Sequence, residues 1–346
     1  MSYYIFHQSL IRYINSGCLR RRDVLISFFF PTLPFFLNAK KISNLFDKVK
    51  KIEKENKEKD RKKVYNVSLE SCQSSDTGIG ALRDYLFHRL NRDLYGVYIH
   101  GSLGVDEKIN YSDVDAFVII KGEVFQNPRR LARTAYKLNK ALRYFHKIDP
   151  LQHHGWFVIA EIELGNYPQT YFPAELFKYA KSLFPGKGLT FKLSVDPERQ
   201  DYEIPFFNLA IGLRYQLENE DYPGNMYQLK GLLSRFMLLP ALYCQAKNRK
   251  GIFKKSSFDE ARKDFSPSDW SIMDEVSEIR LGWHYSITKV QRYLMSRRSP
   301  LLMRLKRKFG PKIPPDLKEK LSPGFYERIL DLVDQMEEKL HEIQVD

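Results

Sequence analysis

Apolar residues follow two different patterns along the chain. Up to about residue 197, short apolar runs alternate with segments of helical spacing. The runs predict strands over 95–100, 113–120 and 153–164, with a further short strand over 190–195. The spaced segments predict helices over 79–94 and 129–145. Beyond residue 197, apolar residues recur every three or four positions, which predicts four long helices over 206–217, 226–246, 270–294 and 324–343. The pattern predicts an α+β fold that ends in a helical bundle.

The N-terminal segment contains the most apolar stretch of the chain, residues 24–37. Its fourteen residues are too few to span a bilayer, and Pro31 and Pro34 interrupt it. A long arginine-containing leader precedes it and no small-residue cleavage site follows it, which argues against a signal peptide. We expect a buried strand or a hydrophobic arm. The alternative is docking on a membrane surface, helped by the adjacent Lys40 and Lys41.

A charged segment follows this apolar stretch. Apolar residues at helical spacing between Ile42 and Ile52 predict an amphipathic helix, and the Lys- and Glu-rich sequence after it predicts a solvated extension or a linker. The predicted organisation is therefore an N-terminal apolar arm and charged helix (residues 1–65), a core domain (66–197) and a C-terminal helical domain (198–346).

Composition limits the classes of protein that fit the chain. With 43% hydrophobic residues, a chain of 346 residues can form substantial cores and is expected to be globular. The formal net charge of +14 indicates attraction to polyanions, which include nucleotides, nucleic acids and anionic membranes. Cys18, Cys72 and Cys244 lack paired spacing, so neither a disulfide framework nor a zinc knuckle is indicated, and a reducing cytoplasm fits best.

Two aspartates one residue apart, Asp113 and Asp115, stand at the start of the apolar run 116–120. Side chains at positions i and i+2 of a strand share one face of the sheet. Two carboxylates held so close repel each other, which is costly for a fold unless a divalent cation or another positive group compensates them. A shared pair of Mg²⁺ ions would provide this compensation.

Gly101 and Ser102 come directly after the predicted strand 95–100. Glycine allows the backbone to approach a ligand closely. If Ser102 opens a helical turn, the free N–H groups there and the serine hydroxyl can hold phosphate oxygens. The segment from residue 95 to residue 120 therefore describes a triphosphate cradle that faces a metal-binding carboxylate pair. The alternative is a simple turn, with Asp113 capping the end of a loop.

This arrangement resembles the signature of the DNA polymerase beta-like nucleotidyltransferase superfamily, with HGS at 100–102 and SDVDAF at 112–117. The segment 229–265 is similar to the helical C-terminal domain of aminoglycoside adenylyltransferases. The resemblance implies a mixed-sheet nucleotidyltransferase core followed by a C-terminal helical bundle. It also implies a Mg²⁺-dependent enzyme that transfers a nucleoside monophosphate from a nucleoside triphosphate to a hydroxyl acceptor and releases pyrophosphate.

Carried over to this sequence, the resemblance makes Gly101 and Ser102 the binders of the nucleotide's phosphates, and Asp113 and Asp115 the ligands of two Mg²⁺ ions. In the superfamily, a basic residue of the helical domain often reaches the triphosphate in the cleft between the two domains. Here the candidates are Lys230 and Lys255, and the alternative is that both are ordinary solvent-facing lysines.

The superfamily also supplies a third acid from the next core strand. Glu161 is the expected third catalytic acid, with Glu163 on the same face and Asp149 just before the strand as alternatives. His153 and His154 stand at the entrance of this strand, where they either orient an acceptor hydroxyl, bind metal or serve as hydrogen-bonded structural groups.

The acceptor is expected to be a small molecule, a protein or an RNA. The sequence pattern predicts no particular acceptor, nucleobase or oligomeric state. Without a third acid, two-metal catalysis would be impaired. The alternative function is therefore a catalytically impaired nucleotide- or RNA-binding regulatory protein with the same core. A third hypothesis is a toxin–antitoxin or defence component that modifies tRNA or protein.

Overall fold

The computed structural model describes residues 2–55, 62–186, 188–296 and 308–345. Its N-terminal segment consists of three helices, α1 (Ser2–Ser16), α2 (Arg21–Phe29) and α3 (Leu33–Glu55). The apolar stretch 24–37 is therefore helical except for the connection 30–32, and the expectation of a strand is wrong. The amphipathic helix expected between Ile42 and Ile52 is confirmed, and it begins earlier, at Leu33. The linker expected beyond it falls partly on residues 56–61, which lie outside the described residues.

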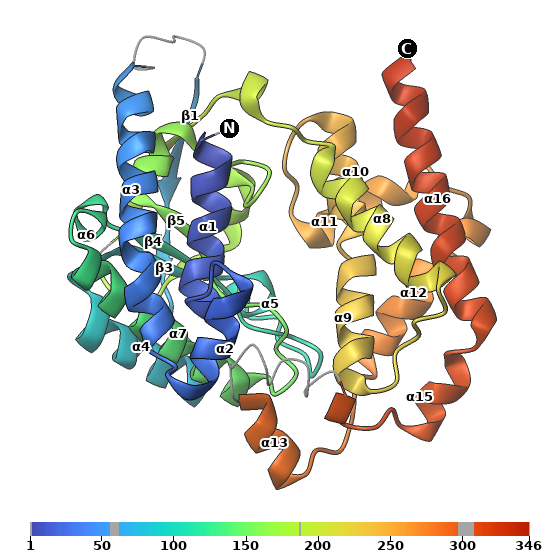
Figure 1. Ribbon diagram of the computed structural model, residues 1–346. Helices are drawn as coiled ribbons and strands as arrows, with labels where there is room; N and C mark the ends of the chain where they lie inside the picture. The colour runs from blue at the N-terminus through green and yellow to red at the C-terminus, as the bar shows by residue number, and fades with distance from the viewer. Residues whose placement is uncertain (1, 56–61, 187, 297–307, 346) are drawn as a thin grey trace.

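The central sheet is mixed, as expected (Figure 1). Its five strands, in spatial order, are β2 (Glu70–Ser71), β6 (Lys181–Ser182), β3 (Leu94–His100), β4 (Asp115–Ile120) and β5 (Phe157–Ala160). Strand β3 runs antiparallel to both β4 and β6, whereas β4 runs parallel to β5. A separate antiparallel pair is formed by β1 (Lys63–Ser68) and β7 (Thr190–Val195), and β7 confirms the short strand expected over 190–195.

Helices cover one face of the central sheet. Besides α1 and α3, they are α4 (Thr77–Leu90), α6 (Gly122–Phe125) and α7 (Pro128–Ile148), and their apolar side chains share one buried cluster with the sheet. In this cluster, Phe46 of α3 stacks on Phe125 of α6 at a ring-centroid distance of 4.5 Å. The opposite face is covered by an aromatic cluster from the pair β1–β7 and from two 3₁₀ helices, η1 (Glu161–Asn166) and η2 (Ala174–Tyr179).

Strand β5 is shorter than the strand expected over 153–164. The chain turns into η1 after Ala160, because the Glu163 carboxylate accepts a hydrogen bond from the Ala160 N–H at 2.7 Å. Glu163 is also paired with His7 of α1, with 2.8 Å between the carboxylate oxygen and Nδ1. The strand therefore ends through contacts with a helix that is distant in sequence.

The C-terminal part is a helical bundle, as expected (Figure 1). Its helices are α8 (Ile204–Glu218), α9 (Met226–Phe236), α10 (Leu239–Asn248), α11 (Lys254–Arg262), α12 (Pro267–Leu281), α13 (Lys289–Ser296), α15 (Pro315–Lys320) and α16 (Pro323–Val345). The single helix expected over 226–246 is broken between α9 and α10, because Pro240 lacks the N–H that a continuous helix would need. The helix expected over 270–294 ends at Leu281.

Besides the aromatic cluster on the sheet, the described residues form two larger apolar clusters. One combines α1 and α3 with the sheet, and the other combines the C-terminal helices with Tyr111 and Leu151 from the sheet-containing half. The domain boundaries at residues 65 and 197 stay predictions. In the described ranges, no helix has both the length and the apolar character needed to cross a membrane.

Candidate active site

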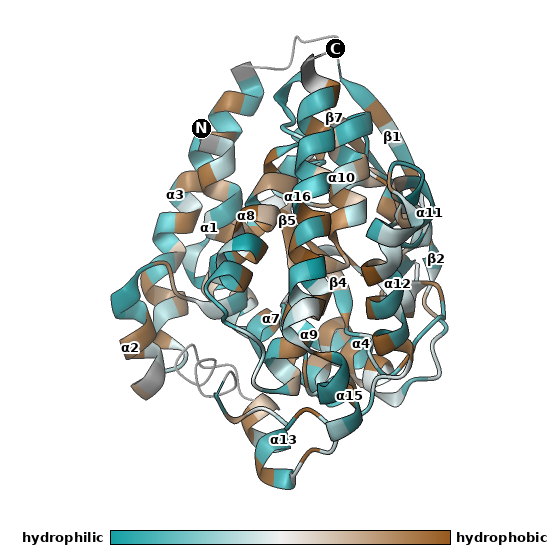
Figure 2. Ribbon diagram, turned by 90° about the vertical axis from the view of Figure 1, so that its right-hand side faces the viewer, coloured by the Kyte–Doolittle hydropathy of each residue, from teal (hydrophilic) through white to brown (hydrophobic). Residues whose placement is uncertain are grey.

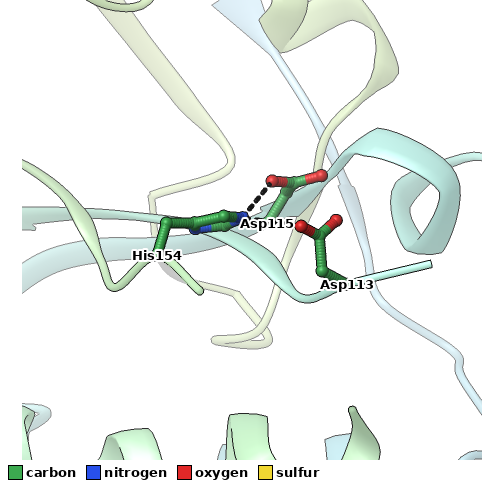
Figure 3. A group of neighbouring side chains, drawn as sticks. All are labelled: Asp113, Asp115 and His154. Carbon is green, nitrogen blue, oxygen red and sulfur yellow. Dashed lines mark hydrogen bonds and ion pairs between the residues drawn. The ribbon is translucent and has the colours of Figure 1, made fainter. Parts of the chain in front are cut away.

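Three side chains converge at the start of β4: Asp113, Asp115 and His154 (Figure 3). Asp115 is the first residue of β4, and Asp113 lies just before it, so the two carboxylates share one side of the chain while Val114 between them is fully buried. His154 comes from the loop that leads into β5. One ligand atom from each residue lies within 4.8 Å of the others.

His154 supplies a positive charge to this carboxylate pair. Its Nε2 lies 3.1 Å from Asp113 Oδ2 and 3.1 Å from Asp115 Oδ1. Burial alone would lower the pKa of His154, but the charge of Asp113 and the hydrogen bonds to both carboxylates outweigh it and raise this pKa to about 10. Burial would likewise raise the pKa of Asp113, yet the charge and hydrogen bond of His154 hold it well below its ordinary value. His154 is therefore a cation at neutral pH, and Asp113 an anion.

Two further histidines near the carboxylates are neutral at pH 7. Burial is the main cause that lowers the pKa of His100 to about 4, and also that of His153 to about 4. His153 Nδ1 lies 3.8 Å from Asp113 Oδ2. His100 ends β3 opposite Asp115, with its ring 4.7 Å from that of Phe172. The positive charge among the three histidines is thus concentrated on His154.

Gln152 fixes the backbone between the two aspartates, a role that the sequence pattern did not reveal. Its Oε1 accepts a hydrogen bond from the Val114 N–H at 2.8 Å, and its Nε2 donates one to the Val114 carbonyl at 3.2 Å. The Gln152 side chain is almost fully buried, so it substitutes for a strand partner at this position. It thereby ties the loop that carries His154 to the segment that carries the carboxylates.

The Gly-Ser bend lies directly against Asp115. Gly101 has a φ of +63°, and a Cβ added to it would lie 2.3 Å from Asp115 Oδ2, so only glycine fits here. Residues Gly101–Gly104 form the short helical turn α5, in which Ser102 is the second residue. The structure thus places Gly101 directly against Asp115, with Ser102 as the next residue of the same bend.

Replacing Gly101 by alanine should lower the free energy of unfolding by about 3 kcal/mol. Two costs contribute: alanine disfavours the left-handed backbone conformation, and its Cβ clashes with the Asp115 carboxylate. Gly186 is the matched control, because its φ is +68° and no atom lies within 4 Å of its added Cβ. Gly186→Ala should cost only about 1 kcal/mol. Urea unfolding of both variants measures the difference. Equal losses in the two variants would show that Gly101 is not packed against Asp115.

Glu161 and Glu163 do not reach the carboxylate pair, and Asp149, on which the charge of Asp113 acts, is held in a buried ion pair. In the parallel register of β4 and β5, Ile120 faces Ala160, which places Glu161 beyond the far end of β4, roughly 20 Å along the strands from Asp115. There Glu161 accepts a hydrogen bond from the Gly122 N–H at 2.9 Å. Glu163 is occupied by His7 and the Ala160 N–H, as described above. The structure thus does not bring Glu161 into the site.

The third candidate, Asp149, is paired with Lys230. Lys230 is fully buried in α9, and its Nζ lies 2.8 Å from Asp149 Oδ2. Burial raises the pKa of Asp149 although Lys230 opposes this shift. Lys255 is 69% exposed and pairs with Glu107 at 2.7 Å. Lys255 therefore neutralises an acid outside the group of Asp113 and Asp115, whereas the charge of Lys230 also contributes to the low pKa of Asp113.

Two other cations of the C-terminal half act on these carboxylates, and the sequence analysis missed both. Burial and the nearby Arg280 lower the pKa of Lys254 to about 8, and the charges of Asp113 and Asp115 oppose this shift. Arg280 of α12 lies with its guanidinium carbon 5.1 Å from the centre of the Tyr111 ring. Within the described part of the chain, neither cation forms an ion pair, and Arg280 Nε is buried without a hydrogen-bond partner. Adjacent residues of a helix point in different directions, so the sequence could have shown that Lys254 and Lys255 have different surroundings. No feature of the sequence indicated Arg280.

No family model matches this sequence, and no curated protein does. Among solved structures, the chain is similar to a spectinomycin adenyltransferase AAD(9) from Enterococcus faecialis, determined with ATP and spectinomycin. The alignment covers 76% of this chain and 100% of that protein, with 13% sequence identity and a TM-score of 0.37.

Proposed function

We propose that this protein is a divalent-cation-dependent nucleotidyltransferase, which transfers a nucleoside monophosphate from a nucleoside triphosphate to a hydroxyl acceptor. The observation that supports the proposal best is that a pair of carboxylates and two cations without ion-pair partners among the described residues act on one another. The carboxylates of Asp113 and Asp115 can hold a cation, and Lys254 and Arg280 from the other half of the molecule carry charge that no ion pair with a described residue neutralises. A nucleotide with its cation needs both kinds of groups.

The donor set fits a divalent cation. Two carboxylates suit Mg²⁺, which the sequence pattern predicts, and they also suit Mn²⁺, whereas the protonated imidazole of His154 would not be a ligand. Asp113 and Asp115 would hold the ion, and a pair of ions shared by both carboxylates stays a prediction. When bound, the cation neutralises phosphoryl charge and favours deprotonation of the attacking hydroxyl. His154 compensates the carboxylates while no cation is bound.

The phosphates of the nucleotide would lie between the bend and the C-terminal helices. Gly101 lets the backbone pass directly against Asp115, and the hydroxyl of Ser102, the next residue of the turn, would contact a phosphate oxygen. Lys254 and Arg280 supply positive charge from α11 and α12. Their side chains would orient the triphosphate and stabilise the charge that develops on the leaving pyrophosphate.

A direct assay tests the function. The full chain is incubated with Mg²⁺ or Mn²⁺ and each α-labelled nucleoside triphosphate, and released pyrophosphate and label on protein, RNA or small molecules are measured. Cation-dependent pyrophosphate release with transfer of label supports the proposal. Absence of release with every nucleotide and cation, together with an unchanged melting temperature, would overturn both the enzyme and the nucleotide-binding alternative.

That alternative is a protein that binds a nucleotide without turnover. It is favoured by one observation: Glu161, Glu163 and Asp149 all contact groups other than the carboxylate pair. In the same assay, a nucleotide-dependent rise in melting temperature without pyrophosphate release would identify this case. The three cysteines are buried and free, which suits a reducing compartment such as the cytoplasm for either function.

Replacing Lys254 by methionine should weaken binding of a nucleoside triphosphate about tenfold, because one charge-assisted contact to the phosphates is lost. The affinity for the corresponding nucleoside should be unchanged. Lys255→Met is the matched control: the same residue type is removed one position along α11, where it faces Glu107. Calorimetric titration of both variants measures the effect. A larger loss for Lys255→Met than for Lys254→Met would contradict the assignment.

A further inference from the structure

The corner between α2 and α3 exposes a group of large apolar side chains. Its members are 39% to 73% exposed: Leu25, Phe29, Phe30, Leu33, Phe36 and Leu37. They come from the last turns of α2, from the connection and from the first turns of α3. Figure 2 shows α2 at the left edge of the molecule, in its lower half. These residues, called the apolar corner below, therefore project from the surface.

The apolar corner is a formed part of the fold, because buried contacts hold its inner side. Asp23, 1% exposed, accepts hydrogen bonds from the N–H groups of Leu19 and Arg20, both at 2.8 Å, and from the Asn38 side chain at 3.0 Å. Asn38 also donates to the Gly17 carbonyl at 2.9 Å. These bonds fix α2 against the start of α3. The exposure of the outer side is thus a property of an ordered structure.

On both helices, basic residues lie one helical turn away from the exposed apolar side chains, on the side farther from the connection between α2 and α3. Arg21 and Arg22 precede Leu25 by four and three positions, so they share its side of α2. On α3, Lys40 and Lys41 follow Leu37 by three and four positions. All four basic side chains are exposed.

The first 46 residues carry six arginines and lysines and a single acid, Asp23, which is buried. The apolar corner is thus accompanied by exposed side chains of positive charge only. This arrangement suits the interface of an anionic bilayer, where apolar side chains enter the acyl boundary and basic side chains contact lipid phosphates. The apolar side of α8, with Ile211 and Tyr215, lacks this basic setting, because the nearby Arg214 is paired with Asp334 and Glu337.

We propose that the apolar corner docks this protein onto anionic lipid membranes, with Phe29, Phe30 and Leu33 entering the interface and the four basic residues contacting lipid phosphates. This docking is separate from the proposed catalytic site, since it uses neither the carboxylates nor the C-terminal cations. The membrane is bound peripherally, because no described helix can span it.

Flotation with phospholipid vesicles tests the proposal on the full chain. The native protein should float with vesicles that contain phosphatidylglycerol, and less with pure phosphatidylcholine or at high salt. A variant with Phe29→Ser, Phe30→Ser and Leu33→Ser should bind at least about tenfold more weakly. A charge variant with Arg21→Gln, Arg22→Gln, Lys40→Gln and Lys41→Gln should also lose at least about tenfold, and only on anionic vesicles.

The matched control replaces three apolar residues of the C-terminal half that are 57% to 71% exposed, Ile211→Ser, Tyr215→Ser and Leu281→Ser, and should float like the native protein. Melting temperatures of all variants show that each one is folded. Native protein that stays unbound on anionic vesicles overturns the proposal. So does vesicle binding that the control variant loses and the apolar-corner variant keeps. Light scattering that shows a dimer dissociated by the apolar-corner changes, without vesicle binding, would assign the corner to a second copy instead.

Discussion

Replacing Asp115 by asparagine is expected to lower nucleotidyl transfer by about a thousandfold or more, and Asp113→Asn should have a similar effect. Asparagine keeps the size of aspartate and can still accept a hydrogen bond from His154. The loss therefore reports the missing negative charge that would hold the cation. Pyrophosphate release at saturating nucleotide measures the rate, and calorimetry should show cation affinity at least about tenfold lower.

The same assay on Glu161→Gln separates the two assignments of the acidic residues. The register of β4 and β5 places Glu161 at the far end of the strands, so this variant should keep a rate close to that of the native protein. A loss for Glu161→Gln as large as that for Asp115→Asn would show that the strand register is wrong. A protein without turnover still allows the test, because cation affinity should fall in Asp115→Asn and remain in Glu161→Gln.

Replacing Lys230 by methionine is expected to reduce the free energy of unfolding by about 3 to 5 kcal/mol, because it leaves the buried Asp149 carboxylate without its positive partner. The pair joins a helix of the C-terminal half to the loop before β5, across 81 positions of sequence. Denaturant unfolding measures the loss. The double variant Lys230→Met with Asp149→Leu should recover much of it, since two apolar side chains can replace a buried ion pair.

Lys255 provides the control for this effect. Its ion pair with Glu107 also links the two halves at 2.7 Å, but both side chains are more than half exposed. Lys255→Met should therefore change the unfolding free energy by less than about 1 kcal/mol. If both lysine variants lost the same amount, burial would not be the property that makes the Lys230 pair important. A fully stable Lys230→Met variant would show that the pair is not buried in solution.

The sequence alone predicted those parts of the candidate site whose residues lie close together in the chain. The spacing of Asp113 and Asp115 placed both carboxylates on one side of the chain, and the preceding Gly-Ser pair placed the bend next to them. The need for a compensating positive charge also followed from that spacing. Its source, His154, did not, because the loop before β5 is brought to this position by the parallel pairing of β4 and β5 and by Gln152.

Sequence reasoning failed where distant contacts decide the structure. The apolar run up to residue 164 predicted a strand with Glu161 and Glu163 on one face, but the contact of Glu163 with His7, 156 positions away, accompanies the turn that ends β5 at Ala160. Lys254 and Lys255 also differ in a way that the sequence analysis did not consider: at the start of α11 one position changes the direction of a side chain by about 100°, so Lys255 pairs with Glu107 while the charges of Asp113 and Asp115 act on Lys254.

The N-terminal helices also have a consequence for how the molecule is held. Helix α3 starts at the apolar corner and runs for 23 residues, roughly 35 Å, with its buried side packed into the same core as the sheet. A protein attached through the first turn of this helix cannot rotate freely on a tether. The carboxylate site would be presented at one height and one tilt above the lipid, and geometry would then favour acceptors that reach that height.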